Sequence, residues 1–266
     1  MRYQVQNPGS LEKATALLDA VLRDEARRNL TDVATEIGLP RATAHRIATT
    51  LVATGFLQRC ARGRFLAGPA LAGLAPWLDP GHVMATLSRP LLARLARRTG
   101  CITHLGRMDD DMVTYLVKEG VDRASLLTQE GMQFEAYCTG IGKVLLAQLP
   151  TARLEEYLAT GPFVALTPNT VVDPAALRQS IARARAEGYA VDDGEIAPDL
   201  HCLAVPVAPH TPPAHFAISL SRVGAAFDAA TRTRLLSLLQ TTATEIAGLV
   251  SPYGTARPLP PKNLPT

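Results

Sequence analysis

The sequence has few cysteines and no long apolar run, and each of these shortages excludes a class of protein. Its four cysteines include no C-x-x-C pair, which excludes a zinc ribbon and a disulfide scaffold and fits a reducing compartment. No apolar run approaches the roughly 18–20 residues that a membrane helix needs, and the N-terminus has no apolar signal-peptide core. We therefore expect a soluble, cytoplasmic protein with no membrane partner.

The remaining composition is that of a folded chain. Hydrophobic residues make up 47% and charged residues 19%, while aromatic residues make up 5%. This balance is typical of globular proteins and not of disordered ones. At roughly 100–200 residues per domain, the 266 residues allow one large domain or two modest ones.

Acidic residues are missing from residues 37–78, although that stretch contains five arginines. Residues 1–78 contain ten basic and six acidic residues, whereas residues 79–266 contain 17 basic and 18 acidic ones. Positive charge gathered in a small N-terminal part is what contact with nucleic-acid phosphates requires. The alternative is a solvated basic face.

The N-terminal pattern predicts a winged helix-turn-helix domain over residues 1–68. Apolar spacing and turn residues predict three helices and two strands, at Ser10–Arg23 (with Ser10 as N-cap), Thr31–Ile37, Arg41–Thr54, Phe56–Arg59 and Arg64–Ala67. The glycine at position 38 permits the tight turn between the second and third helices.

The third helix carries the side chains that we expect to contact DNA. A helix-turn-helix places its second helix in the major groove, where residues near the N-terminus contact base edges. Here these residues are Arg41, Ala42, Thr43, His45 and Arg46. Arginine can bind guanine with two hydrogen bonds, and threonine or alanine can contact a thymine methyl group. Arg62 and Arg64 in the wing suit a phosphate or the minor groove. The alternative is a winged helix used only for protein contact.

One such domain buries too little surface for tight operator binding, so we expect a dimer on a near-palindromic site in double-stranded DNA. Residues 69–81 are predicted to form a linker, with a short helical segment at 69–78 and a hinge at Asp79-Pro80-Gly81. A helix over His82–Thr99 follows. Its apolar stripe could contact a second chain or pack only within its own domain, and comprises Met84, Leu87, Leu91 and Leu95.

The pattern after residue 100 mixes strands and helices, which predicts a second, α+β domain over residues 82–250. Strands are expected at Ile102–Gly106, Met112–Lys118, Ser125–Leu127, Leu203–Val207 and His215–Leu220. Helices are expected at Lys143–Leu149, Ala152–Ala159, Pro174–Glu187 and Ala229–Val250. The tail over 251–266, rich in proline and glycine, is expected to be disordered.

Two patterns in this domain suit a small polar ligand. The motif Gly140-Ile141-Gly142-Lys143 resembles half of a phosphate-binding loop, but Tyr137 and Val144 stand where glycine and a hydroxyl residue are required. A glycine-containing turn before a helix still suits a carboxylate, and a tight-packing turn without a ligand is the alternative. Ser219 and Ser221 share one strand face, so if that face is buried their hydroxyls need polar partners.

Catalytic patterns are weak, and we expect no catalysis, no metal site and no cofactor. The sequence has no G-x-S-x-G motif. A hydrolase-like enzyme with Cys138 or Cys202 as nucleophile is the alternative, because His201 adjoins Cys202. The run Asp192-Asp193-Gly194-Glu195 could be a metal or acid–base site, and we favour a solvated turn.

Longer motifs resemble a known family. They are the nine residues from Gly38 to Arg46, Arg64–Gly68 at the end of the wing, Gly140–Ala147, Gly188–Glu195 and Cys202–Val207. Over residues 10–250 the chain resembles the isocitrate lyase regulator (IclR) family of bacterial transcription factors. It departs from the family pattern at Ala42, at Gly194 and at Asp199, which bears on base preference and effector identity.

The resemblance implies an α+β protein with an N-terminal winged helix-turn-helix, a linker helix and a C-terminal GAF-like α/β effector-binding domain. It implies a homodimer or a dimer of dimers on a palindromic promoter site, and a small organic acid as effector, aromatic acids included. By position, the pocket would use Leu126, Phe134, Thr139, Gly140, Ile141, Asp192, Cys202, Ser219 and Ser221. A ligand-independent scaffold protein is a further alternative.

Overall fold

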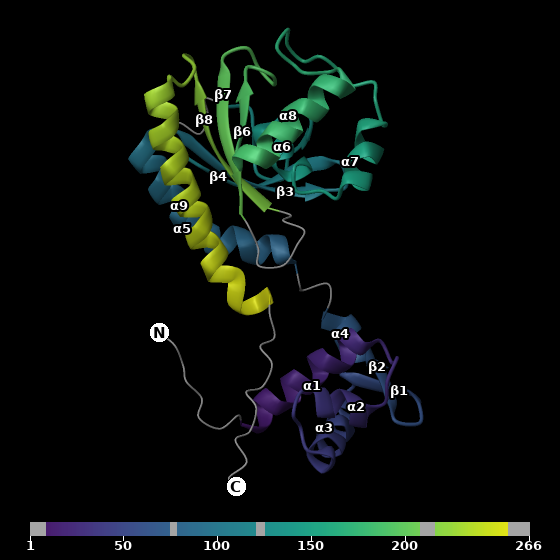
Figure 1. The fold of residues 1–266 in the computed structure, drawn as a ribbon. Helices are drawn as coiled ribbons and strands as arrows, with labels where there is room; N and C mark the ends of the chain where they lie inside the picture. Colours follow the sequence, from purple (N-terminus) through teal and green to yellow (C-terminus); the bar gives the residue numbers. More distant parts are fainter. Residues whose placement is uncertain (1–8, 75–78, 121–125, 208–215, 255–266) are drawn as a thin grey trace. The chain divides into compact units, whose positions relative to one another are not determined.

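The computed structural model describes residues 9–74, 79–120, 126–207 and 216–254. The chain divides between Asp79 and Pro80 into two compact units (Figure 1). No helix within the described ranges is long and apolar enough to cross a bilayer.

The first unit consists of helices and a small antiparallel hairpin. Its elements are α1 (Ser10–Asp24), α2 (Leu30–Glu36), α3 (Arg41–Ala53), β1 (Leu57–Ala61), β2 (Arg64–Ala67) and α4 (Pro69–Leu74). The N-cap of α1 is Gly9 and not Ser10, and Gly9 N–H donates to the Glu12 carboxylate at 2.8 Å. Asn29 caps α2 by accepting the N–H groups of Thr31 and Asp32.

A single apolar core orients α3 in this unit. Leu17 of α1, Leu30 of α2 and Ala44 of α3 are buried together with Leu57 and Phe65 of the hairpin. The turn before α3 has Gly38 at φ +67°, a left-handed conformation that costs glycine little. Because the core takes one face of α3, the opposite face points to solvent.

The second unit is built on a six-stranded antiparallel sheet. Its strands are β3 (Ile102–Asp109), β4 (Met112–Glu119), β5 (Gln133–Glu135), β6 (Ala190–Asp193), β7 (Leu200–Pro206) and β8 (Phe216–Val223). Their order is β5-β4-β3-β8-β7-β6. The helices are α5 (Pro80–Thr99), α6 (Gly140–Leu146), α7 (Thr151–Leu158), α8 (Pro174–Glu187) and α9 (Ala229–Gly254).

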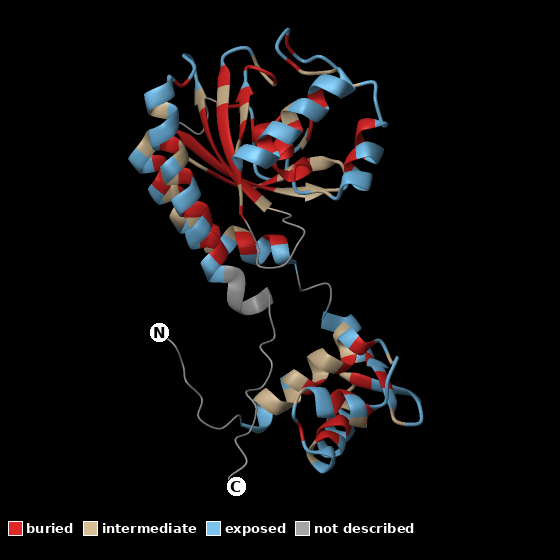
Figure 2. Cartoon of the chain, viewed as in Figure 1, coloured by how far each residue is buried: buried red, intermediate tan, exposed pale blue. Residues whose placement is uncertain are grey.

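Helices cover both faces of this sheet, so the strands are largely buried (Figure 2). On one face, Leu105, Val117 and Ile218 of the strands form a core with residues of α5 and α9. On the other face, Tyr115 and Ala204 lie in a core with α6, α7 and α8. Polar side chains on the second face are therefore enclosed between sheet and helices.

Several predicted boundaries are wrong. Pro80 and Gly81, expected in a hinge, are the first residues of α5. In the predicted stripe of α5, Met84 and Leu95 are buried and the two other leucines are half-buried. Leu92, outside the predicted stripe, is fully buried in the core with the sheet, so this stripe packs mainly within its own unit.

Further differences occur nearer the predicted pocket. Leu126 and Leu127 lie in a bend and not in a strand, and residue 125 is outside the described ranges. Helix α6 begins at Gly140, three residues before the predicted start, because Thr139 acts as its N-cap. Strands β5 and β6 were not expected. Helix α9 continues four residues into the predicted tail, and the predicted turn at 208–215 lies outside the described residues.

Candidate functional site

The outer face of α3 presents the residues predicted to contact DNA. Arg41, Ala42, His45 and Arg46 are exposed and Thr43 is half-buried. The inner face of the same helix is anchored in the core by Ala44, Ile47 and Ala48. A rigid helix with one anchored face and one free basic face has the form of a recognition helix.

The arginines of α3 and of the wing are not neutralised by carboxylates. Ion pairs in the first unit join Arg23, Arg27 and Arg28 to acidic neighbours. Within the described ranges, no such pair involves Arg41, Arg46, Arg62 or Arg64. Their charges are therefore available to an outside partner such as phosphate.

The wing is a two-stranded hairpin pinned to the rest of the unit. Leu30 N–H donates to Gly63 O at 2.7 Å, which ties the wing turn to the start of α2. Arg59 lies over the Phe65 ring at 5.4 Å, so this arginine packs on the hairpin. Arg62 and Arg64 are exposed and remain the wing residues best placed for DNA.

A second group of polar side chains lies buried on the α6 face of the large sheet. We call it the sheet cluster, and it comprises His104, Lys118, Thr128, Asp192, Cys202, Ser219 and Ser221. Each of these side chains is at most 8% exposed. Strand register brings them together, because His104 pairs with both Lys118 and Ser219, and Cys202 pairs with both Asp192 and Ser221.

His104 is at the centre of the hydrogen bonds in the sheet cluster. Its Nε2 is 2.9 Å from the Thr128 hydroxyl, and its Nδ1 is 3.5 Å from the hydroxyls of Ser219 and Ser221. The Ser221 hydroxyl also donates to Cys202 Sγ at 3.2 Å. Burial, together with the nearby Lys118 charge, lowers the pKa of His104 from 6.5 to about 3, so this ring is neutral.

Asp192 is the side chain that most needs a ligand. Its Oδ1 accepts the Glu195 N–H at 2.8 Å, whereas its Oδ2 is buried and has no hydrogen-bond partner among the described residues. A buried oxygen without a partner is costly. Burial raises the pKa of this carboxyl from 3.8 to about 7. The Glu195 N–H hydrogen bond opposes this rise, as do the Lys143 charge and the neighbouring Cys202 thiol, whereas the Glu195 charge adds to it. Asp192 can thus change protonation near neutral pH.

The structure brings most of the predicted pocket residues to the sheet cluster. Leu126 packs with Cys202, and Phe134 reaches the cluster through Tyr115, whose ring lies 5.3 Å from Phe134 and 4.8 Å from His104. A Cβ added to Gly140 would be 3.3 Å from Ala204 Cβ, so α6 begins directly over the sheet.

The side chains of two predicted pocket residues, Thr139 and Ile141, make contacts within the fold that the sequence did not predict. The Thr139 hydroxyl accepts the Gly142 N–H at 2.8 Å. Ile141 is buried and its side chain packs over Gly106, where an added Cβ would come within 2.9 Å. Both residues therefore lie next to the cluster with side chains that are already engaged.

Sequence reasoning missed three cluster members, His104, Lys118 and Thr128. Lys118 Nζ donates to the carbonyls of Leu126 at 2.8 Å and Thr128 at 2.5 Å. A usable signal was present, because His104 and Lys118 lie next to the apolar residues Leu105 and Val117 within predicted strands. A polar residue inside such a strand has to be satisfied within the fold.

The turn after β6 is only partly solvated, contrary to the prediction of a solvated turn, because Asp193 is exposed but its neighbours are not. Asp192 is fully buried and Glu195 is 6% exposed. The Glu195 carboxylate forms a buried ion pair with Lys143 of α6. Lys143, the lysine of the half phosphate-loop motif, is thus used inside the fold, and the turn anchors α6 over the sheet.

Comparison with known proteins finds a family match for each of the two units. A family model described as bacterial transcriptional regulator IclR C-terminal matches residues 81–248, and one described as IclR helix-turn-helix domain matches residues 10–60. The chain belongs to the IclR family. It is therefore a transcriptional regulator with a helix-turn-helix DNA-binding domain and an effector-binding C-terminal domain.

Individual relatives extend over most of the chain of this IclR-family regulator. It is 31% identical over 233 residues to the HTH-type transcriptional regulator XynR of Escherichia coli K12, covering 87% of this chain and 92% of XynR. The crystal structure of Thermotoga maritima IclR has 26% identity and a TM-score of 0.60, covering 91% of this chain and 98% of that one. An IclR homolog from Microbacterium hydrocarbonoxydans, complexed with 4-hydroxybenzoate, shares the fold at 24% identity and a TM-score of 0.59, covering 90% of this chain and 98% of that one.

The geometry of this IclR-family regulator gives a thiol nucleophile no support. Cys138 is fully buried, and burial raises the pKa of its thiol to about 12. Burial, with the Asp192 charge, also raises the pKa of the Cys202 thiol. Both sulfurs are therefore protonated at neutral pH and poorly nucleophilic. Among the described residues, no group of three or more His, Cys, Asp or Glu side chains could hold a metal ion.

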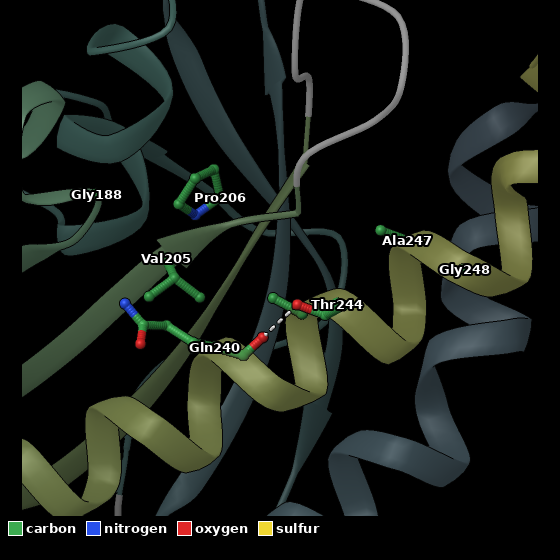
Figure 3. A pocket seen from close by; sticks show the side chains of 8 residues that line it. Gly188, Val205, Pro206, Gln240, Thr244, Ala247 and Gly248 are labelled. Atoms are coloured by element: carbon green, nitrogen blue, oxygen red, sulfur yellow. Dashed lines mark hydrogen bonds between the residues drawn. The ribbon is translucent and has the colours of Figure 1, made fainter.

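A separate surface groove of the regulator lies where α9 meets the end of β7 (Figure 3). Its volume is about 400 Å³, and it is lined by Gly188, Val205, Pro206, Gln240, Ala243, Thr244, Ala247 and Gly248. Its polar side chains are those of Gln240 and Thr244, and the Thr244 hydroxyl already donates to Gln240 O at 3.0 Å. With no charged lining residue, this groove does not compete with the sheet cluster as a site for an acid.

Proposed function

We propose that this regulator binds a palindromic promoter site as a dimer or a dimer of dimers, and that a small organic acid at the sheet cluster changes its affinity for that site. The observation that carries the DNA part is the exposed face of α3, whose arginines have no carboxylate partner among the described residues. The wing arginines Arg62 and Arg64 add contacts to phosphate or the minor groove.

Gel retardation with a fragment of the protein's own promoter region, at low ionic strength, tests the DNA part. Wild type should retard the fragment, and the double variant Arg41→Ala, Arg46→Ala should not. Arg27→Ala is the matched control, since Arg27 is an exposed arginine that pairs with Glu25. Equal retardation by all three proteins would remove α3 as the recognition helix, whereas failure of wild type to retard the fragment would favour the scaffold alternative.

A second copy of the chain is needed for tight operator binding. Helix α4 has no buried residue within its own unit, and its Leu74 is 43% exposed. Apolar side chains on an uncovered helix are available to another chain. Sedimentation at micromolar concentration should show a dimer or larger species, and a monomer bound to a single half-site would contradict the proposal.

The sheet cluster offers complementary groups to an acid. The Lys118 ammonium and the hydroxyls of Ser219 and Ser221 suit a carboxylate. The unpartnered Oδ2 of Asp192 can accept a hydrogen bond from a ligand donor. A negatively charged ligand favours the protonated form of this carboxyl, so acid binding should strengthen as the pH falls through about 7.

A thermal-shift panel of acetate, glycolate, pyruvate, benzoate and 4-hydroxybenzoate tests the effector part, since a ligand of the folded state raises Tm. At least one acid should stabilise wild type. Asp192→Ala and Ser219→Ala should reduce that shift more than they reduce promoter binding without acid. Equal loss of both would give these residues a purely structural role.

Acid binding can regulate only through a difference in affinity between two arrangements of the protein. Coupling free energies of about 1–3 kcal/mol would change operator affinity roughly 5- to 150-fold.

The enzyme alternative makes a separate prediction, because it requires the bound acid to be consumed. Recovery of every acid unchanged after hours with saturating protein would exclude it for that panel.

A further inference from the structure

A bidentate ion pair joins α5 to the segment that covers the sheet cluster. Arg89 of α5 donates through Nη1 and Nη2 to the two carboxylate oxygens of Glu130, at 2.8 and 2.9 Å. Arg89 Nη1 also donates to Glu119 of β4 at 2.9 Å. The paired side chains are only partly exposed, at 40% for Arg89 and 33% for Glu130. A bidentate ion pair of this kind fixes both the orientation of the two side chains and the distance between them.

Glu130 belongs to the segment Leu126–Met132, which we call the cover segment. Four further hydrogen bonds fasten it to the sheet cluster. Glu130 Oε1 accepts the backbone N–H of Lys118 at 3.0 Å. The Lys118 ammonium donates to two carbonyls of the cover segment, and the Thr128 hydroxyl contacts His104. A ligand that displaced Thr128 or Leu126 would therefore move Glu130 as well.

Helix α5 is the element through which such a movement can leave the second unit. It begins at Pro80, directly after the residue at which the chain divides into two units. Hydrogen bonds thus lead from the serines through His104 to Thr128. The backbone of the cover segment continues from Thr128 to Glu130, which is hydrogen-bonded to Arg89 on α5. A chain of contacts like this one can couple two distant sites when it has two arrangements and binding at each site favours one of them.

We propose that Arg89 is a positioning residue that fastens the cover segment to α5 through Glu130 and so couples occupancy of the sheet cluster to operator affinity. The coupling part rests on the proposed function. Arg89 belongs neither to the sheet cluster nor to α3 or the wing. Removing it should spare basal operator binding and impair only the response.

The first test needs no ligand. Hydrogen exchange measured by mass spectrometry should be about 3- to 10-fold faster in Arg89→Gln and Glu130→Gln than in wild type, within residues 126–135 and 112–119. The control is Arg94→Gln, which removes a similarly exposed ion pair with Glu245 from the same helix and should leave both stretches unchanged. Unchanged exchange in Arg89→Gln would overturn the positioning role.

The second test measures coupling with whichever of the five named acids raises the wild-type Tm most. Operator affinity with and without that acid gives a ratio for each protein. In Arg89→Gln and Glu130→Gln the ratio should fall to less than about a third of the wild-type value, while affinity without acid stays within about twofold. The double variant should lose no more than either single variant, because the two residues act as a unit.

Arg89→Lys supplies the conservative comparison, since lysine keeps the charge but not the two-pronged geometry, and should restore part of the ratio. A full wild-type ratio in Arg89→Gln would overturn the coupling role. If no acid of the panel binds wild type, the proposed effector class fails and the coupling role fails with it. The exchange comparison then still decides whether Arg89 positions the cover segment.

Discussion

Replacing Asp192 by asparagine should stabilise the ligand-free protein at alkaline pH and leave its stability at acidic pH nearly unchanged. The folded protein holds the Asp192 proton up to a pKa of about 7, whereas the unfolded chain loses it near 3.8. Between these values the folded state binds more protons than the unfolded state. The free energy of unfolding therefore falls as the pH rises through this window, and asparagine, which does not titrate, avoids the fall.

The size of the effect follows from the two pKa values. At about 1.36 kcal/mol per pH unit, the interval between 3.8 and about 7 corresponds to a loss of about 4 kcal/mol in wild type above pH 7. Asparagine keeps an oxygen for the Glu195 N–H and replaces the unpartnered Oδ2 by an amide group. We expect Asp192→Asn to exceed wild type by about 2–4 kcal/mol at pH 8, by about 1–2 kcal/mol at pH 5 and by less than about 1 kcal/mol at pH 4.

Urea unfolding followed by far-ultraviolet circular dichroism, in buffers free of carboxylic acids, measures this difference at several pH values. Asp193→Asn is the matched control, because Asp193 is the neighbouring residue of β6 and its side chain, which contacts His201 Nδ1 at 2.6 Å, is 70% exposed. Its difference from wild type should be well below that of Asp192→Asn at pH 8. An Asp192→Asn protein that is less stable than wild type by the same amount at pH 5 and pH 8 would refute the reasoning, because Asp192 would then be ionised and well paired in the fold.

Three further outcomes are expected. Arg41→Ala or Arg46→Ala alone should weaken promoter binding roughly 5- to 150-fold in a retardation assay with Tm unchanged, and unaltered affinity would contradict the assigned DNA contacts. Gly142→Ala should lower the free energy of unfolding by more than about 3 kcal/mol, since its Cβ would lie 2.1 Å from a backbone carbonyl oxygen. Gly140→Ala, whose nearest contact would be 3.3 Å, is its control, and equal melting of both variants would argue against the close packing of α6 on the backbone before it. His104→Gln should flatten the acid side of the stability profile. The His104 pKa is lowered from 6.5 to about 3, so wild type should lose about 3 kcal/mol between pH 6.5 and pH 4, and identical slopes would show that His104 is not buried neutral.

Much of the first unit was predictable because its signals are local. The 3.6-residue apolar period marks helices directly, and α3 was placed within one residue of its observed end. The glycine at 38 and the hairpin pattern marked the turn and the wing. The errors, such as the N-cap of α1 at Gly9 and the end of β1 at Ala61, are shifts of one or two positions that depend on hydrogen bonds of the backbone.

The second unit was less predictable because its short elements have weak local signals. Strand β5 has three residues and β6 has four, too few for an alternating pattern to stand out. Their place depends on pairing with β4 and β7. The cluster residues predicted from sequence came partly from family position, and those without such a precedent, His104 and Lys118, were missed.

The amino-acid sequence alone was enough to predict the basic face of the third helix, the wing and the family of this protein, because each of these depends on patterns within short contiguous segments. Only the tertiary structure decided which polar side chains meet inside the second unit. His104 and Ser219 are 115 residues apart and become neighbours through the pairing of β3 with β8. The proton affinity of Asp192 was decided in the same way, since it depends on the helix and strands that remove water from around the carboxyl.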